Sequence, residues 1–507
     1  MRRQIFVVVI SLIVGTAAFL AISRAGGLVG VQWKQIGPAP LAVNGDQSVM
    51  GVGPNSGEVQ NIAIDPRSAN KTIFIATEAG GIWESTDGGL TWKTTTDFLS
   101  SLSMGAVALD FGNPSIVYAG TGNDAQQGFF NGVGVFVSTD GGLNWTLSAG
   151  SGVLAGKGIA QMVSPAANTL VVGTNPGFQG DGSGVNGIFF SSNNGGTFTE
   201  TLTGQIDDLH LDTTVPDQVI AAVDQNGLFV SADGGQTFGP NLWTATNGSP
   251  LDPTTTPNFT PGFITFGQST KPNDNTIYAS VENLFTAPPG WGLFVSTDSG
   301  ATWTQATATG AVPANFGYGQ PVAVEPNLST TVYLGFINLF KSTDGGATFA
   351  LADSPGGSLQ VHNDWHALTF SPTPPASGNT PLFVGTDGGV ATTPDGGTTW
   401  TNINGSAAGT SLATNLFRAI DIGRGSSFNN RFSYGGMQDT GTGGFRSGDT
   451  PTTWHMGNFA GDGVATAVAF GSPMHVIGGA DGCPKFTTNG GNLWTPSTGL
   501  TDGAGHT

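Results

Sequence analysis

The stretch Ser138-Thr139-Asp140-Gly141-Gly142-Leu143-Asn144-Trp145 returns in nine versions along the 507-residue chain. Its pattern is Ser, any residue, Asp, any residue, Gly, two further residues and an aromatic. The copies end at Trp92, Trp145, Phe198, Phe238, Trp303, Phe349, Trp400 and Trp494 and, in a degraded version, at Trp454. Such regular recurrence predicts an architecture built from repeats.

The residues of this stretch are those of a tight β-turn. Asp accepts hydrogen bonds from the backbone N–H groups that follow it, Gly adopts backbone angles closed to other residues, and the aromatic ring returns to the core. Asn193 and Asn489 replace the Asp in two copies. An Asn can still accept those bonds but cannot replace a catalytic carboxylate, so we interpret the Asp as architectural.

Each repeat adds short alternating apolar runs to this turn. Between Gly105 and Trp145 three such runs precede the turn and one strand follows it. Four antiparallel strands per 40 to 65 residues are typical of a blade of a β-propeller. No segment has helical periodicity, so the predicted fold class is all-β, a propeller of nine four-stranded repeats.

The repeated turn resembles the Asp-box, or BNR, repeat of sialidases, xyloglucanase-type glycoside hydrolases, the sortilin ectodomain and photosystem II assembly factors. The resemblance implies a β-propeller. It leaves the function open, because that fold hosts enzymes, receptors and chaperones.

The first 27 residues are expected to lie outside the fold. Arg2 and Arg3 precede an apolar run over residues 5–22, and small residues follow it. This pattern predicts a signal peptide, or an N-terminal membrane anchor if it is not cleaved. We therefore expect a secreted or extracytoplasmic protein that meets a membrane only through this segment.

The remaining chain is acidic, since it has 12 Lys and Arg but 34 Asp and Glu once Arg2, Arg3 and Arg24 are removed. This balance argues against nucleic acid as a partner. The single Cys483 excludes an internal disulfide framework.

The division of the repeats has two interpretations. In the favoured one, residues 28–405 form a seven-bladed propeller and residues 406–507 begin a second, because the small residues from Ala407 to Thr414 resemble a linker. In the other, all repeats belong to one ten-bladed ring. In both, we expect closing strands beyond residue 507.

Candidate chemistry lies in the irregular loops between the second and third strands and between blades, where a repeated scaffold normally binds its ligands. His362, Asp364 and His366 lead into the innermost strand of the seventh blade. In an extended chain these alternate residues point to one side. They are candidates for a divalent metal site, for proton transfer, or for a purely structural polar network.

Three carboxylates are predicted on the same face: Asp387, Asp439 and Asp462. Together with the His362–His366 segment they resemble a set of bacterial Asp-box proteins described as glycosyl-hydrolase-like, in which HxDxH, GTDGG, GGxQDxG and GDG motifs occur in this order. The resemblance implies a catalytic role for the three Asp residues. Asp-Gly pairs also form tight turns without any catalytic role.

A second resemblance, to xyloglucanase-type hydrolases, rests on Ala76-Thr77-Glu78-Ala79-Gly80-Gly81-Ile82-Trp83. It implies that Glu78 stands where those enzymes carry a general base. Hydrolysis of a glycosidic bond needs two opposed carboxyl groups. A sialidase is excluded, because the three arginines that grip a sugar carboxylate are missing from most of the chain: Arg67 is the only Arg between Arg24 and Arg418.

Two functions remain open. One is a glycan-binding or glycan-hydrolysing propeller, with Trp291 and Trp365 as stacking faces for sugar rings and a polysaccharide as partner. The other is a non-catalytic propeller that holds an extracytoplasmic protein or peptide.

Overall fold

The computed structural model describes residues 55–497 except for 123–130, 177–184, 244–260, 284–289, 307–308, 311–318, 354–360, 406–409, 427, 447–448, 450–453, 457–460 and 481–482. The predicted signal or anchor at residues 1–27 lies outside this part of the chain, as does most of the degraded turn that ends at Trp454. Within it, no helix has the length and apolar character needed to cross a membrane. The described residues all belong to one compact unit, residues 37–507.

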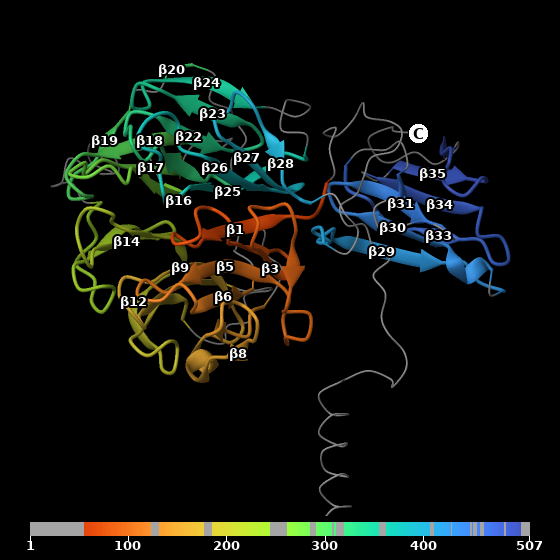
Figure 1. The fold of residues 1–507 in the computed structure, drawn as a ribbon, viewed down its shortest axis with the longest axis horizontal. Coiled ribbons are helices and arrows are strands. Elements are labelled where there is room, and N and C mark those ends of the chain that lie inside the picture. The colour runs from red at the N-terminus through yellow and green to blue at the C-terminus, as the bar shows by residue number, and fades with distance from the viewer. Residues whose placement is uncertain are drawn as a thin grey trace, which may run out of the picture. The chain divides into compact units, whose positions relative to one another are not determined.

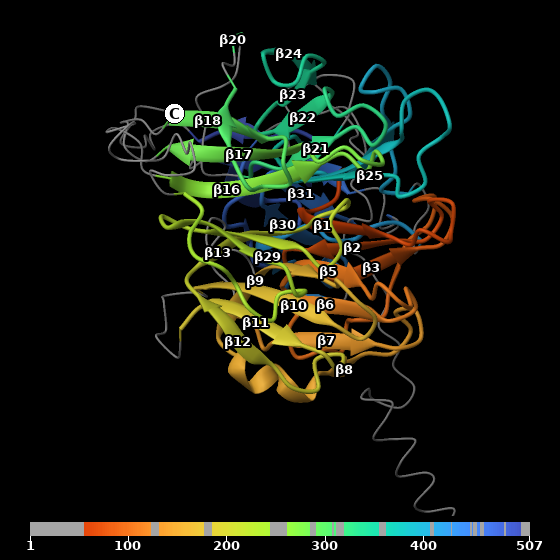
Figure 2. The ribbon, with the colours of Figure 1, turned by 90° about the vertical axis from the view of Figure 1, so that its left-hand side faces the viewer.

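The described residues form nine sheets, which confirms the all-β propeller class (Figure 1). The first three sheets each hold four strands in sequence order. They are β1 (Val59–Ile64), β2 (Ile73–Thr77), β3 (Gly81–Ser85) and β4 (Lys93–Thr94); β5 (Met104–Leu109), β6 (Val117–Thr121), β7 (Val135–Ser138) and β8 (Thr146–Leu147); and β9 (Lys157–Val163), β10 (Leu170–Pro176), β11 (Gly187–Ser191) and β12 (Thr199–Thr203). Figure 2 shows β9 to β12 side by side in that order.

Of the next four sheets, the fifth and seventh keep this plan and the fourth and sixth depart from it. The fourth has three described strands, and the sixth gains β20, which pairs in parallel with β24. They comprise β13 (Ile206–Leu211), β14 (Val219–Val223) and β15 (Gly227–Ser231); β16 (Pro261–Gln268), β17 (Ile277–Asn283), β18 (Gly290–Ser296) and β19 (Thr304–Gln305); β20 (Thr309–Gly310), β21 (Val322–Val324), β22 (Val332–Gly335), β23 (Leu339–Ser342) and β24 (Thr348–Asp353); and β25 (Trp365–Phe370), β26 (Leu382–Thr386), β27 (Gly389–Thr393) and β28 (Thr401–Asn402).

The last two sheets repeat the four-stranded order. They are β29 (Phe417–Ile422), β30 (Ser433–Met437), β31 (Gly441–Phe445) and β32 (His455–Met456), and β33 (Ala467–Val468), β34 (Val476–Ala480), β35 (Cys483–Thr487) and β36 (Thr495–Pro496). Two short 3-10 helices, η1 (Ala149–Val153) and η3 (Asn429–Arg431), complete the elements.

Burial explains the composition of the strands. The second strands of several sheets, such as β2, β6 and β14, are buried at every position. Sheets packed on both faces select such continuous apolar runs, whereas the two-residue outer strands β8 and β36 are exposed.

The innermost strands contact one another in sequence order from β1 to β25, and β1 also contacts β25 and β26. Figure 1 shows β1 between β25 and β5. This succession supports a ring made from repeats one to seven. The division of the chain at about residue 405 stays a prediction.

The repeated turns have the predicted chemistry. In the second repeat the Asn144 amide donates to Asp140 Oδ1 at 2.9 Å and the Gly142 amide to Ser138 Oγ at 2.8 Å. Where Asn193 replaces the Asp, its Oδ1 accepts the same bond from the Thr197 amide at 2.9 Å. The carboxylate is thus used as a backbone acceptor, a role that an amide oxygen fills equally well.

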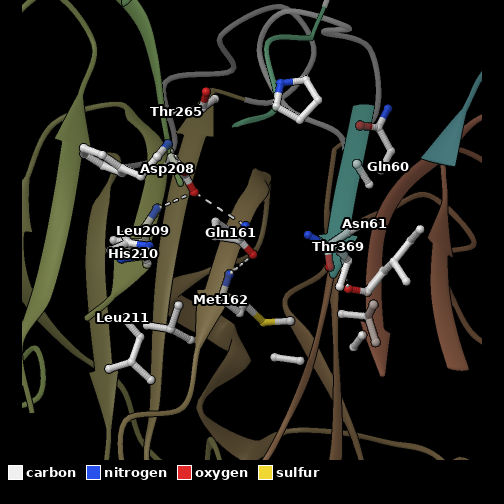
Figure 3. Close-up of a pocket in the computed structure, with 18 of the residues that line it drawn as sticks. Gln60, Asn61, Gln161, Met162, Asp208, Leu209, His210, Leu211, Thr265 and Thr369 are labelled. Carbon is white, nitrogen blue, oxygen red and sulfur yellow. Dashed lines mark hydrogen bonds between the residues drawn. The ribbon is translucent and has the colours of Figure 1, made fainter. Parts of the chain in front are cut away.

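The innermost strands enclose a cavity of about 690 Å³, lined by residues from β1, β5, β9, β13, β16 and β25 and by the residues that lead into β21 (Figure 3). Asp208 lies on its wall and accepts hydrogen bonds from the Leu209 and Phe266 amides at 2.8 and 2.9 Å. Gln161 from the neighbouring β9 approaches the same carboxylate at 3.5 Å. Enclosure raises the pKa of Asp208 to about 7, although these hydrogen bonds oppose the shift.

We predict that Asp298→Ala lowers the free energy of unfolding by about 1 to 3 kcal/mol, because it leaves the turn donors without their acceptor. Asp298 Oδ1 accepts from the Thr302 amide and from Ser296 Oγ, both at 2.8 Å. Asp298→Asn is the matched control, since Asn193 fills the same position. Thermal melts of both variants check this, and equal melting temperatures for Asp298→Ala and the parent would contradict it.

We also predict that Asp208 makes the fold less stable as pH rises. Its folded pKa of about 7 lies above the value of about 3.9 expected in the unfolded chain. Its contribution to stability is therefore complete below the unfolded pKa and is lost as pH rises through 7. The melting temperature of Asp208→Asn relative to the parent should be higher at pH 8 than at pH 5. A difference that does not change with pH would contradict the assignment.

Candidate functional site

Three carboxylates follow the second strands of three different sheets. Glu78 comes directly after β2, Asp387 directly after β26, and Asp439 two residues after β30. All three therefore lie in the turn between the second and third strand of their repeat. Glycines at the start of the third strands, Gly81, Gly389 and Gly441, have positive φ angles and let the chain return at once.

The segment from His362 to His366 does not have the extended conformation that the sequence predicts. β25 begins only at Trp365, and Asp364 has a φ of +59°. The pairing of β25 with β26 also shifts register between Trp365 and Ala367, which is a bulge at His366. The side chains converge through this irregular backbone and not through strand alternation.

Asp387 lies between the two imidazoles. Its Oδ1 is 2.6 Å from His366 Nε2, and its Oδ2 is 3.6 Å from His362 Nδ1. The Asp387 amide donates to the carbonyls of Asn363 and Asp364 at 3.2 and 3.3 Å, so the turn is fixed to the segment that carries the imidazoles. The Asp387 side chain has no exposed surface.

Glu58 is a member of this cluster that sequence reasoning missed. It directly precedes β1, and its Oε1 lies 3.6 Å from His366 Nε2. The contact between β1 and β25 brings these two residues together across the chain. The only local signal is that Glu58 precedes the innermost strand of its repeat, as His362 and Asp364 do in theirs.

The enclosure of the cluster determines its protonation. Burial raises the pKa of Asp387 well above its ordinary value, and the negative charges of Asp439, Glu58 and Asp364 add to this effect. Burial also lowers the pKa of His366 to about 3, so this imidazole is neutral at pH 7.

Asp439 and Asp462 form a second, more open part of the site. The Asp439 amide donates to Asp462 Oδ1 at 3.2 Å, and Arg418 forms an ion pair with Asp462 at 3.0 Å. Burial raises the pKa of Asp439 to about 7, and the charges of Asp462, Asp364 and Glu78 contribute to the shift. The Asp462 side chain is 38% exposed. The charges of Asp439 and Asp462 thus act on Asp387 and His362 of the cluster, and the charge of Glu78 acts on Asp439.

The two tryptophans predicted to stack on sugars are placed differently. Trp365 is fully buried and packs against Trp400, with 5.7 Å between ring centroids. It has no face for a ligand, so its predicted role is wrong. Trp291 is half-buried against Phe336 and Phe349 and donates its indole N–H to Ser280. Its place in the core explains why the sequence carries an aromatic residue there.

Gly388 allows the approach of this turn to the imidazole segment. A Cβ at this position would lie 2.3 Å from the His362 amide nitrogen and 2.7 Å from Asn55 Oδ1. That Asn oxygen accepts a hydrogen bond from the same amide at 2.8 Å. Only a residue without a side chain fits here.

We predict that Gly388→Ala lowers the free energy of unfolding by about 1 to 3 kcal/mol through this overlap. Gly152→Ala is the matched control, since nothing lies within 4 Å of its Cβ position, and its effect should stay within about 0.5 kcal/mol. Chemical denaturation measures both. Similar losses in the two variants would contradict the close packing of the turn.

Comparisons with known proteins support the fold and a relationship to glycoside hydrolases. No protein-family model matches the chain. A xyloglucanase from Hypocrea jecorina is 30% identical over 26% of this chain and 19% of its own length. The match therefore spans about a fifth of that enzyme.

Two solved structures share the architecture over most of the chain. The GH74 xyloglucanase of Xanthomonas campestris has a TM-score of 0.63 and 15% identity, covering 94% of this chain and 70% of its own. An ancestral GH74 enzyme has a TM-score of 0.59 and 18% identity, covering 89% and 64%. The chain is thus a β-propeller with glycoside-hydrolase-like relatives.

Proposed function

We propose that this propeller binds a polysaccharide beside Asp439 and Asp462 and hydrolyses its glycosidic bonds, with Asp439 as the proton donor. The observation that carries this proposal is the pairing of a carboxyl group whose pKa is raised to about 7 with a second, accessible carboxylate held by an Arg. Glycosidases use such a pair, in which one group protonates the leaving oxygen and the other activates water or attacks the sugar.

The environments of the two carboxyl groups suit different roles. Asp439 is partly enclosed, and burial together with the charges around it keeps a proton on it near neutral pH, which a general acid needs. Asp462 is exposed, and its carboxylate lies 3.0 Å from the Arg418 guanidinium, which fixes its orientation. We assign Asp462 the role of the partner carboxylate.

Glu78 and Asp387 have supporting roles in this proposal. Both are buried, with exposed fractions of 6% and 1%. The charge of Glu78 contributes to the raised pKa of Asp439, and Asp387 positions the two imidazoles. A residue that the substrate cannot reach acts on the reaction through its charge and through the residues it holds.

The partial sequence match to a xyloglucanase supports a glycan as the substrate class. Xyloglucan is therefore the first polysaccharide to test, followed by other β-glucans. We further propose that the activity is extracytoplasmic, because the apolar run of residues 5–22 follows Arg2 and Arg3 at the start of the chain.

We predict that Asp439→Asn lowers kcat on the polysaccharide that the parent hydrolyses by about 10²- to 10⁴-fold with little change in KM. The parent should lose activity as pH rises through about 7, since the donor must be protonated. Release of reducing ends, measured between pH 5 and 9 on a polysaccharide panel, checks this. Asp217→Asn is the control, because Asp217 lies in a distant repeat with a φ of +59° that Asn tolerates.

Equal loss of activity in the two variants, or full activity in Asp439→Asn, would contradict the role of Asp439. A folded parent that neither binds nor cleaves any member of the panel would overturn the glycan proposal. That result would favour the second function predicted from the sequence, a scaffold that binds an extracytoplasmic protein or peptide.

A further inference from the structure

The cluster around Asp387 holds two sets of metal-ligand atoms that share this residue. One set is Glu58, His366 and Asp387, and the other is His362, Asp364 and Asp387. In each set the ligand atoms lie within 4.8 Å of one another. Each set therefore combines one imidazole nitrogen with two carboxylate oxygens.

These spacings fit a single small cation. An ion held at roughly 2.0 to 2.2 Å by nitrogen and oxygen ligands keeps those ligands roughly 3 to 4 Å apart. The 2.6 and 3.6 Å separations between Asp387 and the two imidazoles are close to this range, and a small outward movement of the rings would admit the ion. Asp387 offers one oxygen to each imidazole and is the ligand common to both sets.

Two buried polar atoms of the cluster make no hydrogen bond to the described residues. His362 Nδ1 and Asp364 Oδ1 are buried, and neither has a hydrogen-bond partner among the described residues. Burial of a polar atom without a partner is unfavourable. His362 Nδ1 lies 4.0 Å from Asp364 Oδ2, the other oxygen of that carboxylate, and 3.6 Å from Asp387 Oδ2. One cation placed among the three groups would give the two unpartnered side chains a ligand bond.

The supporting contacts are those of a prepared site. Asn55 Oδ1 accepts from the His362 amide, and the Asp387 amide is held by two backbone carbonyls. These contacts fix the backbone that carries His362 and Asp387. The hydrogen bond between His366 and Asp387 leaves His362 Nδ1 and Asp364 Oδ1 without a partner among the described residues.

We propose that Glu58, His362, Asp364, His366 and Asp387 form a divalent-metal centre. The mixture of imidazole and carboxylate ligands selects an ion of intermediate hardness such as Zn²⁺ or Mn²⁺ over Ca²⁺ and Mg²⁺, which prefer oxygen ligands alone. This proposal does not depend on glycan hydrolysis, since the centre could equally fix the turn that carries Asp387 in a binding scaffold.

The test is calorimetric titration of the EDTA-treated, full-length protein with ZnCl₂ at pH 7.5. We expect one equivalent of Zn²⁺ to bind, with an affinity at least about 100-fold weaker in His362→Ala/His366→Ala. His475→Ala is the matched control, because His475 is exposed and should leave the affinity unchanged. Parallel titrations with CaCl₂ and MgCl₂ should show at least about 10-fold weaker binding than Zn²⁺.

A second variant distinguishes loss of a metal ligand from loss of the fold. Asp364→Asn keeps the shape of the side chain and removes one ligand charge, and it should weaken Zn²⁺ binding while the melting temperature of the metal-free protein stays the same or rises. Equal Zn²⁺ binding by the parent, the double variant and Asp364→Asn would overturn the proposal, as would tighter binding of Ca²⁺ than of Zn²⁺. Zn²⁺ binding without glycan cleavage would leave the centre standing and refute only the proposed hydrolase.

Discussion

The contact between β1 and β25 is the constraint on which the candidate site depends. It places the residues that precede β1 against the segment that precedes β25, so that Asn55 and His362 meet across 307 positions of sequence. Without it Glu58 would not reach His366. The repeated turns hold the strands within each sheet, but this one contact brings Glu58 of the first repeat beside His366 and Asp387 of the seventh.

The repeats could be predicted from the sequence because their chemistry is local. An Asp or Asn that accepts a backbone N–H four residues later needs only its own turn, so the pattern around Asp140 identifies the same structure wherever it recurs. The gathering of His362, Asp364, His366 and Asp387 was also predicted, although by the wrong backbone conformation. The sequence contained the ligand types and their order, while the bulge at His366 depends on packing against β26.

The parts that could not be predicted depend on distant contacts. Glu58 has no motif of its own and acquires its place only when β1 packs beside β25. Trp365 looks like an exposed aromatic beside polar residues, yet it points to the interior and packs against Trp400. The side of the strand that an aromatic occupies is set by the register with the neighbouring strand, which a bulge changes.

The protonation of the site depends on how many carboxylates are gathered there. Several carboxylates lie in one enclosed place, so protons remain on Asp387 and Asp439 that would otherwise be lost near pH 4. A cation at the cluster would relieve this repulsion and lower the pKa of Asp439. Metal content therefore has to be fixed whenever the pH dependence of activity is measured.

The residues around Asp387 are proposed to form a site for a divalent ion. An anomalous difference map, recorded at the zinc edge from crystals grown with Zn²⁺, tests this directly. We expect a peak at about 2.0 to 2.2 Å from an Asp387 oxygen and from an imidazole nitrogen of His362 or His366. Stoichiometric zinc elsewhere in the crystal, with no peak at Asp387, would contradict it.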